Sequence, residues 1–365
     1  MPSHFAAKFG GAELQVQLLI ETILRREGLE LVYLARNVAA GFDDPRYRLI
    51  RIPHIRGVQR LGFWPDRYAL LKLLRRERPD LIYQRVGCAY TGYAAAYARK
   101  AGVPLVWHVS IDSDLEPDLG RFSPGIAAIE RLLRDYGIRH ADAIVAQSND
   151  QRRRLLERYN RTSTVIHNFQ QPPESTLPKS SMFTVVWVAN LKSAKRPELF
   201  LEIVRRFRGR NDMKFVMVGR GGDRAPYRDQ LRSCISDCGD LFEFKGELSL
   251  DAVNHCLQRS HVFVNTSDDE GFPNTLIQCW FREVAVITLG VDPDHALSRN
   301  HIGSIVDSVT GAVQQINWLH EHPDEWQSMV SRARRYVHDN HSMANADRLV
   351  DLLVGQLGRC SKQAE

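Results

Sequence analysis

The 365-residue sequence lacks any apolar run long enough to cross a bilayer. Its opening stretch, MPSHFAAKFGGAELQ, also lacks the basic start and apolar core of a secretory signal. Low-complexity tracts and short-period repeats are missing too. Hydrophobic residues make up 44% and charged residues 25%, which is typical of a soluble globular protein with room for two domains. We therefore expect a cytoplasmic protein.

Cysteines are few and scattered, at positions 88, 234, 238, 256, 279 and 360. This distribution indicates reduced thiols, not a disulfide framework. Cys234 and Cys238 are spaced to share a helix face, but no second close pair completes a zinc site. The acid pairs Asp112–Asp114 and Asp292–Asp294 are short patterns that occur often by chance. We expect no metal.

The net charge is +6, but the sequence contains no helix-turn-helix, RNA-stacking or zinc-finger pattern. We therefore do not expect nucleic acid as a partner. A basic excess also suits nucleotides and phospholipid surfaces. Trp64 precedes the first of two basic clusters, which comprise Lys72, Arg75, Arg76 and Arg78, and Arg152, Arg153, Arg154 and Arg158. A solvated helix face is the commoner explanation, and peripheral contact with the anionic inner face of a membrane is the alternative.

Short apolar runs alternate with amphipathic stretches along the whole chain. In the first half the predicted strands are 31–34, 81–83, 105–107, 143–146 and 165–168. The predicted helices between them include 69–77, 92–100 and 129–136. This succession predicts an α/β fold with a parallel, doubly wound sheet.

The composition changes at QQPPESTLPKSS (170–181), which is rich in Pro and Ser and predicts a linker. The alternation then resumes, with predicted strands at 185–188, 215–218, 242–244, 262–264 and 284–287 and a final helix at about 344–357. We predict two Rossmann-like domains facing a central cleft, with these bounds: first domain 1–169, linker 170–183, second domain 184–343, closing helix and tail 344–365. Ligands of such sheets bind beyond the carboxyl ends of the strands.

The stretch DEGFPNTLIQCW (269–280) follows one of these strand ends. Gly271 and Pro273 indicate a turn, and Asn274 or Thr275 is expected to cap the helix that follows. Free backbone N–H groups at a helix start favour an anion. A carboxylate such as Glu270 suits a ligand that also carries hydroxyls. An ordinary strand-to-helix turn with a surface glutamate is an equally good explanation of this stretch alone.

Two further segments are candidate phosphate sites. A glycine pair, Gly10 and Gly11, precedes a predicted helix and allows close approach of the backbone to a ligand. Lys192, Lys195 and Arg196 lie in a loop after a strand, where concentrated cations would hold a diphosphate. Pro197 closes this loop, since proline favours the first turn of a helix. Both patterns also occur in ordinary turns and solvated loops.

His108 follows the predicted strand 105–107. A histidine in this position is more often structural, but a strand's carboxyl end also favours a role in binding. The segment VGRGGD (218–223) is not a dinucleotide fingerprint, because Arg224 stands where the third glycine belongs.

Taken in order, these segments resemble a known family. Eight segments are similar, in order and spacing, to motifs of the retaining glycosyltransferases of family 4 (glycosyl transferases group 1). They are FGGAELQ, WHVSID, VAQSNDQRRRLLERY, VIHNF, WVANLKSAKRPELF, FVMVGRGGD, FKGEL and VNTSDDEGFPNTLIQCW. That family has the GT-B fold of two Rossmann-like domains, an acceptor-side domain followed by a nucleotide-sugar donor domain. The resemblance spans nearly the whole sequence.

The resemblance implies roles for the candidate residues. Glu270 would meet the hydroxyls of the donor sugar, Lys195 would neutralise the leaving diphosphate, and His108 would lie under the sugar at the reaction centre. The remaining residues implied in donor binding are Gly10, Gly11, Asn190, Lys192, Gly271, Phe272, Pro273, Asn274, Thr275 and Gln278. The implied reaction passes a sugar from a nucleotide diphosphate to an acceptor hydroxyl with retained configuration and without a metal or cofactor. The acceptor would be a glycan or a lipid-linked glycan.

The sequence departs from the family pattern at three places. Gln278 stands where the family has a second glutamate, so a hydrogen bond to the ribose would lose its charge assistance. Asn190 stands where an arginine is usual, and Lys192 is expected to supply part of that charge. The family's first strand precedes the glycine turn, but MPSHFAAK is too short and too poor in β-branched residues to predict it.

These observations favour an active glycosyltransferase in polysaccharide or glycolipid biosynthesis. The departures at Asn190 and Gln278 motivate a first alternative, a catalytically degenerate protein that binds a sugar or a partner. The second alternative is a nucleotide-sugar epimerase of the same architecture, which would need further acid and base groups around the sugar.

Overall fold

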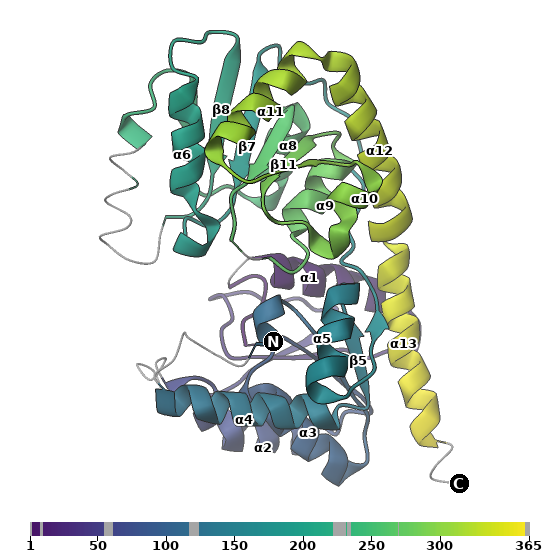
Figure 1. Cartoon of the computed structure of the whole chain (residues 1–365). Helices are drawn as coiled ribbons and strands as arrows, with labels where there is room; N and C mark the ends of the chain where they lie inside the picture. The colour runs from purple at the N-terminus through teal and green to yellow at the C-terminus, as the bar shows by residue number, and fades with distance from the viewer. Residues whose placement is uncertain are drawn as a thin grey trace. The chain divides into compact units, whose positions relative to one another are not determined.

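The computed structural model describes residues 2–7, 10–54, 61–116, 124–221, 231, 235–268 and 270–361, without the side chains of 359–361. The chain forms two compact units, which are Met1–Phe169 together with Met343–Glu365, and Gln170–Ser342. In both units parallel strands alternate with helices (Figure 1). The predicted α/β class with parallel sheets in two domains is confirmed.

Unit 2, residues Gln170–Ser342, contains a six-stranded parallel sheet in the order β12-β11-β10-β7-β8-β9. Its strands are β7 (Phe183–Val188), β8 (Met213–Val218), β9 (Phe242–Phe244), β10 (Val262–Asn265), β11 (Ala285–Leu289) and β12 (Ser304–Val306). Its described helices of five residues or more are α6 (Pro197–Arg206), α8 (Leu250–Arg259), α9 (Asn274–Phe281), α10 (Ala296–Asn300), α11 (Val309–Glu321) and α12 (Pro323–His341).

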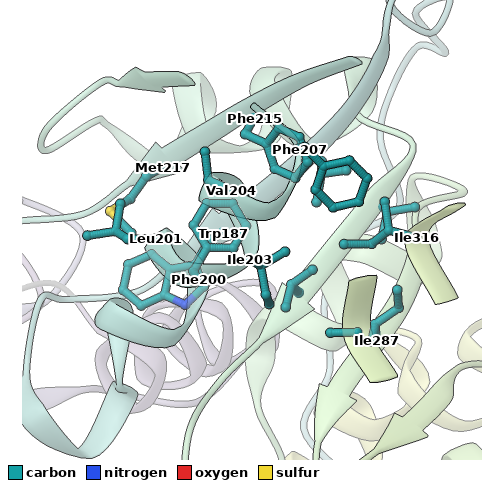
Figure 2. Packing of buried hydrophobic residues seen from close by; sticks show 14 of the residues in the cluster. Trp187, Phe200, Leu201, Ile203, Val204, Phe207, Phe215, Met217, Ile287 and Ile316 are labelled. Carbon is teal, nitrogen blue, oxygen red and sulfur yellow. The ribbon is translucent and has the colours of Figure 1, made fainter. Parts of the chain in front are cut away.

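Helices cover both faces of this sheet because its central strands are apolar on both sides. Trp187 of β7 packs on one face with residues of α6 and α11, and its neighbour Val186 packs on the other face with α9. Figure 2 shows the first cluster, in which Phe200 from α6 lies beside Trp187 and Phe215 from β8 lies near Phe207. Burying each such side chain contributes about 1.5–3 kcal/mol. The packing thus fixes the strand ends from which the loops emerge.

Unit 1 comprises the other residues and contains two parallel sheets, β1-β2 and β3-β4-β5-β6. Its strands are β1 (Val32–Ala35), β2 (Arg48–Arg51), β3 (Ile82–Arg85), β4 (Leu105–His108), β5 (Ala143–Ala146) and β6 (Thr164–Val165). Its described α-helices are α1 (Gly11–Ile23), α2 (Arg67–Glu77), α3 (Ala89–Ala101), α4 (Pro124–His140), α5 (Asn149–Tyr159) and α13 (Ala344–Ser361).

The two sheets of unit 1 share helices but not hydrogen bonds between strands, as far as the structure describes them. Helix α1 packs Val16 and Ile20 against Tyr33 of β1 and packs Leu19 in the cluster that contains Val106 of β4. A third cluster joins both sheets to residues of α2. The segment before the glycine turn contributes one isolated parallel bridge, between Ser3 and Asn37.

Several predicted elements differ from the observed ones. The strand expected at 165–168 is only the two-residue β6, because the chain then turns to place Asn168 in a polar network. Strands β2 and β12 were not predicted, since RLIR and SIV are short and only partly buried edge segments. None of the described helices combines the length and hydropathy needed to span a membrane.

Helices α3 and α4 approach each other closely through two glycines. A Cβ atom at Gly137 would lie 2.4 Å from the carbonyl carbon of Thr91, and one at Gly92 would lie 2.4 Å from the carbonyl oxygen of Leu133. Both obstacles are backbone atoms, which cannot move aside as a flexible side chain would. The sequence at these two positions is therefore fixed by packing.

We expect Gly137→Ala to destabilise the protein by about 1–3 kcal/mol, because the added methyl overpacks the contact between the two helices. Gly125 lies in the same helix with nothing within 4 Å of the added Cβ, so Gly125→Ala is the matched control. It should leave stability unchanged or raise it by up to about 1 kcal/mol. Urea unfolding of both variants measures the difference, and equal midpoints would contradict the close contact.

Candidate active site

The loop that follows β7 is anchored to the end of β8. The amide of Ala189 donates to the carbonyl of Val218 (3.1 Å), and the amide of Leu191 donates to the carbonyl of Arg220 (3.0 Å). A Cβ at Gly219 would lie 1.9 Å from the carbonyl oxygen of Ala189, so only glycine permits this approach. This anchoring fixes the segment that carries the predicted cations.

Arg196 joins this loop to the loop that follows β10. It has a left-handed backbone (φ 43°) and precedes Pro197, the first residue of α6, as predicted. Its Nε donates to the carbonyl of Thr266 (3.0 Å), and its Nη1 pairs with Asp268 (2.8 Å). The guanidinium is therefore engaged within the protein, and Lys195 is the better placed of the two cations to meet a ligand.

Thr266 completes the connection between the two loops. Its hydroxyl donates to the carbonyl of Lys195 (2.6 Å) and accepts a hydrogen bond from the indole Nε1 of Trp187 (2.9 Å). Both partners lie on the chain of β7 and its loop. The main chain at Lys195 is thereby fixed relative to the sheet.

Lys195 and Glu270, 75 positions apart in the sequence, meet in this structure. The ammonium group of Lys195 forms an ion pair with Oε1 of Glu270, and Ser267 Oγ donates to the same oxygen (2.9 Å). The side chains of Lys195 and Glu270 are 26% and 21% exposed, so solvent and small ligands reach both. A cation and a carboxylate therefore lie together beyond the carboxyl ends of β7 and β10.

Helix α9 begins immediately after this pair. Pro273 is its N-cap residue and Asn274 its first residue, so the predicted capping by Asn274 or Thr275 is wrong. Proline has no side-chain acceptor, and no side chain in the described residues caps the helix. The first turn thus has no side-chain cap, although the amide of Leu276 donates to the carbonyl of Pro273 (3.1 Å). The amides of this turn give the helix start a partial positive charge.

Two of the predicted donor-binding side chains point into the protein. Phe272 is 4% exposed and packs against Trp280 and His341, so only its backbone is available to a ligand. Gln278 is 6% exposed, and its amide nitrogen donates to Asn254 of α8 (2.9 Å). Gly271 and Thr275 are half-buried beside them.

Asn190 and Lys192 lie on the loop after β7. Asn190 is half-buried and its carbonyl accepts the amide of Lys192 (2.8 Å). Lys192 is exposed and precedes the short 3-10 helix Ser193–Lys195. The loop therefore presents the charge of Lys192 to solvent, in the unit that also holds Lys195.

His108, in unit 1, is the last residue of β4 and is 1% exposed. Its Nδ1 lies 2.8 Å from the hydroxyl of Tyr83 and 3.5 Å from Nη1 of Arg85, both on the neighbouring strand β3. Burial, reinforced by the positive charge of Arg85, lowers the pKa of His108 well below its usual value. The ring is therefore neutral at physiological pH.

Gly10 and Gly11 also lie in unit 1. Gly10 is the N-cap residue of α1, with an extended backbone (φ −162°) and no side chain to cap the helix, and Gly11 is the first helical residue. A Cβ at Gly10 would meet only the flexible carboxylate of Glu13, at 2.9 Å. The turn therefore offers bare backbone at a helix start, as expected.

The other sequence candidates do not form a site in the described part of the chain. Gln151 donates to Asp112 (2.8 Å) and the amide of Ser110 donates to Asp114 (2.8 Å), so this acid pair holds its own loop. No three His, Cys, Asp or Glu side chains gather there to hold a metal ion. Asp269, Gly222 to Arg224 and Cys234 lie outside the described residues.

Four residues of the candidate site were not predicted from the sequence, namely Thr266, Ser267, Tyr83 and Arg85. Thr266 and Ser267 directly follow β10, and Tyr83 and Arg85 lie in the last three residues of β3. Closeness to the carboxyl end of a strand is the only sequence signal that marks them. Their roles depend on pairing between segments far apart in the chain, which single motifs do not reveal.

Comparisons with known proteins identify the family of this chain. The family model for Glycosyltransferase Family 4 matches residues 9–169, and the model for Glycosyl transferases group 1 matches residues 182–322. No curated protein matches the chain by sequence.

Solved structures show the same fold. A sucrose-phosphate synthase from Thermosynechococcus elongatus matches with a TM-score of 0.76 at 15% identity, covering 100% of this chain and 96% of that one. WaaG, a glycosyltransferase involved in lipopolysaccharide biosynthesis, gives 0.75 at 13% identity, covering 97% and 98%. Anabaena HepE in complex with UDP-glucose gives 0.74 at 15% identity, covering 97% and 98%. The two family models together span both units, and the chain therefore belongs to the family 4 glycosyltransferases, enzymes of the GT-B fold.

Proposed function

We propose that this glycosyltransferase moves a sugar from a nucleotide-diphosphate sugar to an acceptor hydroxyl with retention of the anomeric configuration. The observation that carries the proposal is the cluster of Lys195, Glu270 and Ser267 beside the uncapped start of α9. A cation and helix amides suit a diphosphate, and a carboxylate suits sugar hydroxyls. The structure of HepE with UDP-glucose supports a donor of this class.

In this proposal the departing diphosphate carries the charge that the protein must stabilise. Lys195 and the first-turn amides of α9 supply positive potential that is in place before the reaction, so little reorganisation is needed. Glu270 accepts hydrogen bonds from the sugar hydroxyls, and Ser267 orients its carboxylate. The bond between the anomeric carbon and the phosphate oxygen breaks, and the acceptor oxygen forms the new bond on the same face. The acceptor proton passes to a phosphate oxygen. Lys195 and these amides take the place of a metal ion in the proposed reaction.

A further part of the proposal concerns the acceptor, a glycan or lipid-linked glycan of polysaccharide or glycolipid biosynthesis, and the place of the enzyme in the cell. The structure of WaaG, involved in lipopolysaccharide biosynthesis, supports this class. The proposed location is the cytoplasm, with peripheral contact at the inner membrane face.

The two basic clusters of the sequence differ in their surroundings. On α2 the side chains of Tyr68, Lys72, Arg75 and Arg76 are exposed at helical spacing, and Tyr68 is 76% exposed. Arg76 pairs with Glu77, but no ion pair to Lys72 or Arg75 is found among the described residues. On α5, by contrast, Arg153 pairs with Asp150, and Arg154 pairs with Glu116. An amphipathic aromatic beside cations suits an anionic membrane surface, so α2 is the proposed contact.

We expect thermal stabilisation by a nucleoside diphosphate or its sugar, with EDTA present, and its loss in Lys195→Ala. Losing a charged hydrogen bond of about 1.5–3 kcal/mol weakens binding roughly 10- to 100-fold. Lys214→Ala is the matched control, since Lys214 lies near the opposite end of β8 and pairs with Glu243. Equal shifts in both variants, or a strict need for added metal, would contradict the donor site as proposed.

We expect Glu270→Gln to retain nucleoside-diphosphate binding and to lose transfer by about 10- to 100-fold, because the amide accepts sugar hydroxyls without charge assistance. Product analysis with and without acceptor measures this, and the anomeric configuration of the product tests retention. Donor binding without any transfer would favour the degenerate binding protein, and sugar conversion without acceptor would favour an epimerase.

We expect Lys72→Glu/Arg75→Glu to weaken binding to vesicles of equal parts phosphatidylcholine and phosphatidylglycerol at least about tenfold, since each cation near such a surface contributes about 1 kcal/mol. Arg152→Glu/Arg153→Glu on α5 changes the charge equally and should have a much smaller effect. Co-sedimentation at low salt measures both. Equal losses would show that net charge alone matters, and no binding by the unaltered protein would refute membrane contact.

A further inference from the structure

The buried polar residues at the strand ends of unit 1 form one chain of hydrogen bonds whose directions are fixed. Gln147 Nε2 donates to the carbonyls of Val109 (2.6 Å) and Ser110 (2.8 Å). Its Oε1 is therefore the acceptor for Asn168 Nδ2 (2.9 Å). Asn168 Oδ1 therefore accepts from Arg85 Nη2 (3.0 Å). Because carbonyl oxygens only accept, they determine the orientation of both amides and of the guanidinium.

The same guanidinium faces Nδ1 of His108. Arginine has donors only, so the guanidinium 3.5 Å from Nδ1 favours an unprotonated Nδ1 that can accept. With Nδ1 unprotonated, the hydroxyl of Tyr83, at 2.8 Å, is the donor to the same nitrogen. The ring proton then lies on Nε2. This atom is buried and has no hydrogen-bond partner among the described residues.

We propose that Tyr83 and Arg85 are positioning residues that hold His108 as the neutral Nε2–H tautomer, so that its ring serves as a hydrogen-bond donor and not as a base. The acceptor of the hydrogen bond from Nε2–H would be an oxygen of the substrate, and this part of the proposal rests on the proposed function. The fixed tautomer itself does not depend on it.

The charges around the ring support a neutral donor. Arg85 is 1% exposed, and no ion pair to it is found in the described part of the chain. A buried cation without a carboxylate is costly, which indicates that its charge has a use. A proton on His108 would place a second positive charge about 3.5 Å from the first, at the distance of the existing contact.

The other neighbours of the ring do not oppose this effect. Across the sheet on β5 the residue paired with His108 is Val145, which is apolar. Tyr83 is neutral, since burial raises its pKa. Asp112 and Asp114 follow β4, but Gln151 and the Ser110 amide already bind them. His167 is bound through Nδ1 to the carbonyl of Gln147.

The test is ¹⁵N NMR of the full chain labelled in histidine, with the His108 signals assigned by their loss in His108→Gln. We expect a single neutral Nε2–H tautomer that does not titrate as the pH falls from about 8 to 5.5, a range that includes the ordinary histidine pKa of about 6.5. An Nδ1–H tautomer, or titration of His108 near 6.5, would overturn the proposal. This readout needs no enzyme activity, so it can fail or succeed independently of the proposed function.

Two variants separate the contributions of the neighbours. Tyr83→Phe removes the closer donor and should yield a mixture of tautomers, with kcat reduced about 10- to 100-fold and KM for the donor little changed. Arg85→Gln keeps a donor but removes the charge, so the pKa of His108 should rise. Activity should then fall at the acid end of the pH range, where the ring gains a proton.

Arg85→Lys restores the charge and should keep the ring neutral, which a purely structural role would not predict. Arg134→Gln, at another fully buried arginine of unit 1, is the control for packing effects and should leave the His108 signals unchanged. If Arg85→Gln fails to fold, Tyr83→Phe alone decides the matter. Unchanged tautomer and pH profile in the folded variants would refute the positioning role.

Discussion

The hydrogen bonds of Thr266 are the contacts on which the proposed nucleotide-sugar site of unit 2 depends. One hydroxyl joins the indole of Trp187, a core residue, to the main chain of Lys195, a residue at the surface. The left-handed backbone at Arg196 costs of order 1–3 kcal/mol, and the bonds from its side chain to Thr266 and Asp268 offset that cost. Without this connection the loop after β7 would be an ordinary mobile surface loop, and Lys195 would meet Glu270 only transiently.

The ion pair between Lys195 and Glu270 lets each side chain neutralise the other's charge before a charged ligand binds. Each is about a quarter exposed, so the pair itself adds little stability, and it can open at low cost. A diphosphate offers the ammonium more negative charge than one carboxylate does, and sugar hydroxyls offer the carboxylate donors in return. The ligand thus replaces one interaction with two. Ser267 keeps Glu270 in place during the exchange.

Sequence patterns predicted what short segments determine by themselves. The α/β alternation, the strand ends before His108 and Glu270, and Pro197 as the first residue of α6 all follow from local composition. Local patterns did not predict features that depend on tertiary contacts. Phe272 looked like part of a ligand-facing turn, yet it is buried against Trp280 and His341. Tyr83 and Arg85 looked like strand residues without a function, because their relation to His108 arises only from the register of β3 on β4.

The charged residues of the two units differ in how deeply they are buried, and this difference determines what each charge can act on. In unit 2 the cation and the anion of the site are partly solvated and paired, so both remain available to a ligand of mixed polarity. In unit 1 the cation Arg85 is removed from water and acts on a neutral ring. Solvent would screen the field of an exposed arginine, but a buried one keeps it. Burial of the His108 ring, reinforced by this permanent cation, therefore lowers the pKa of His108 and keeps the ring neutral across the physiological pH range.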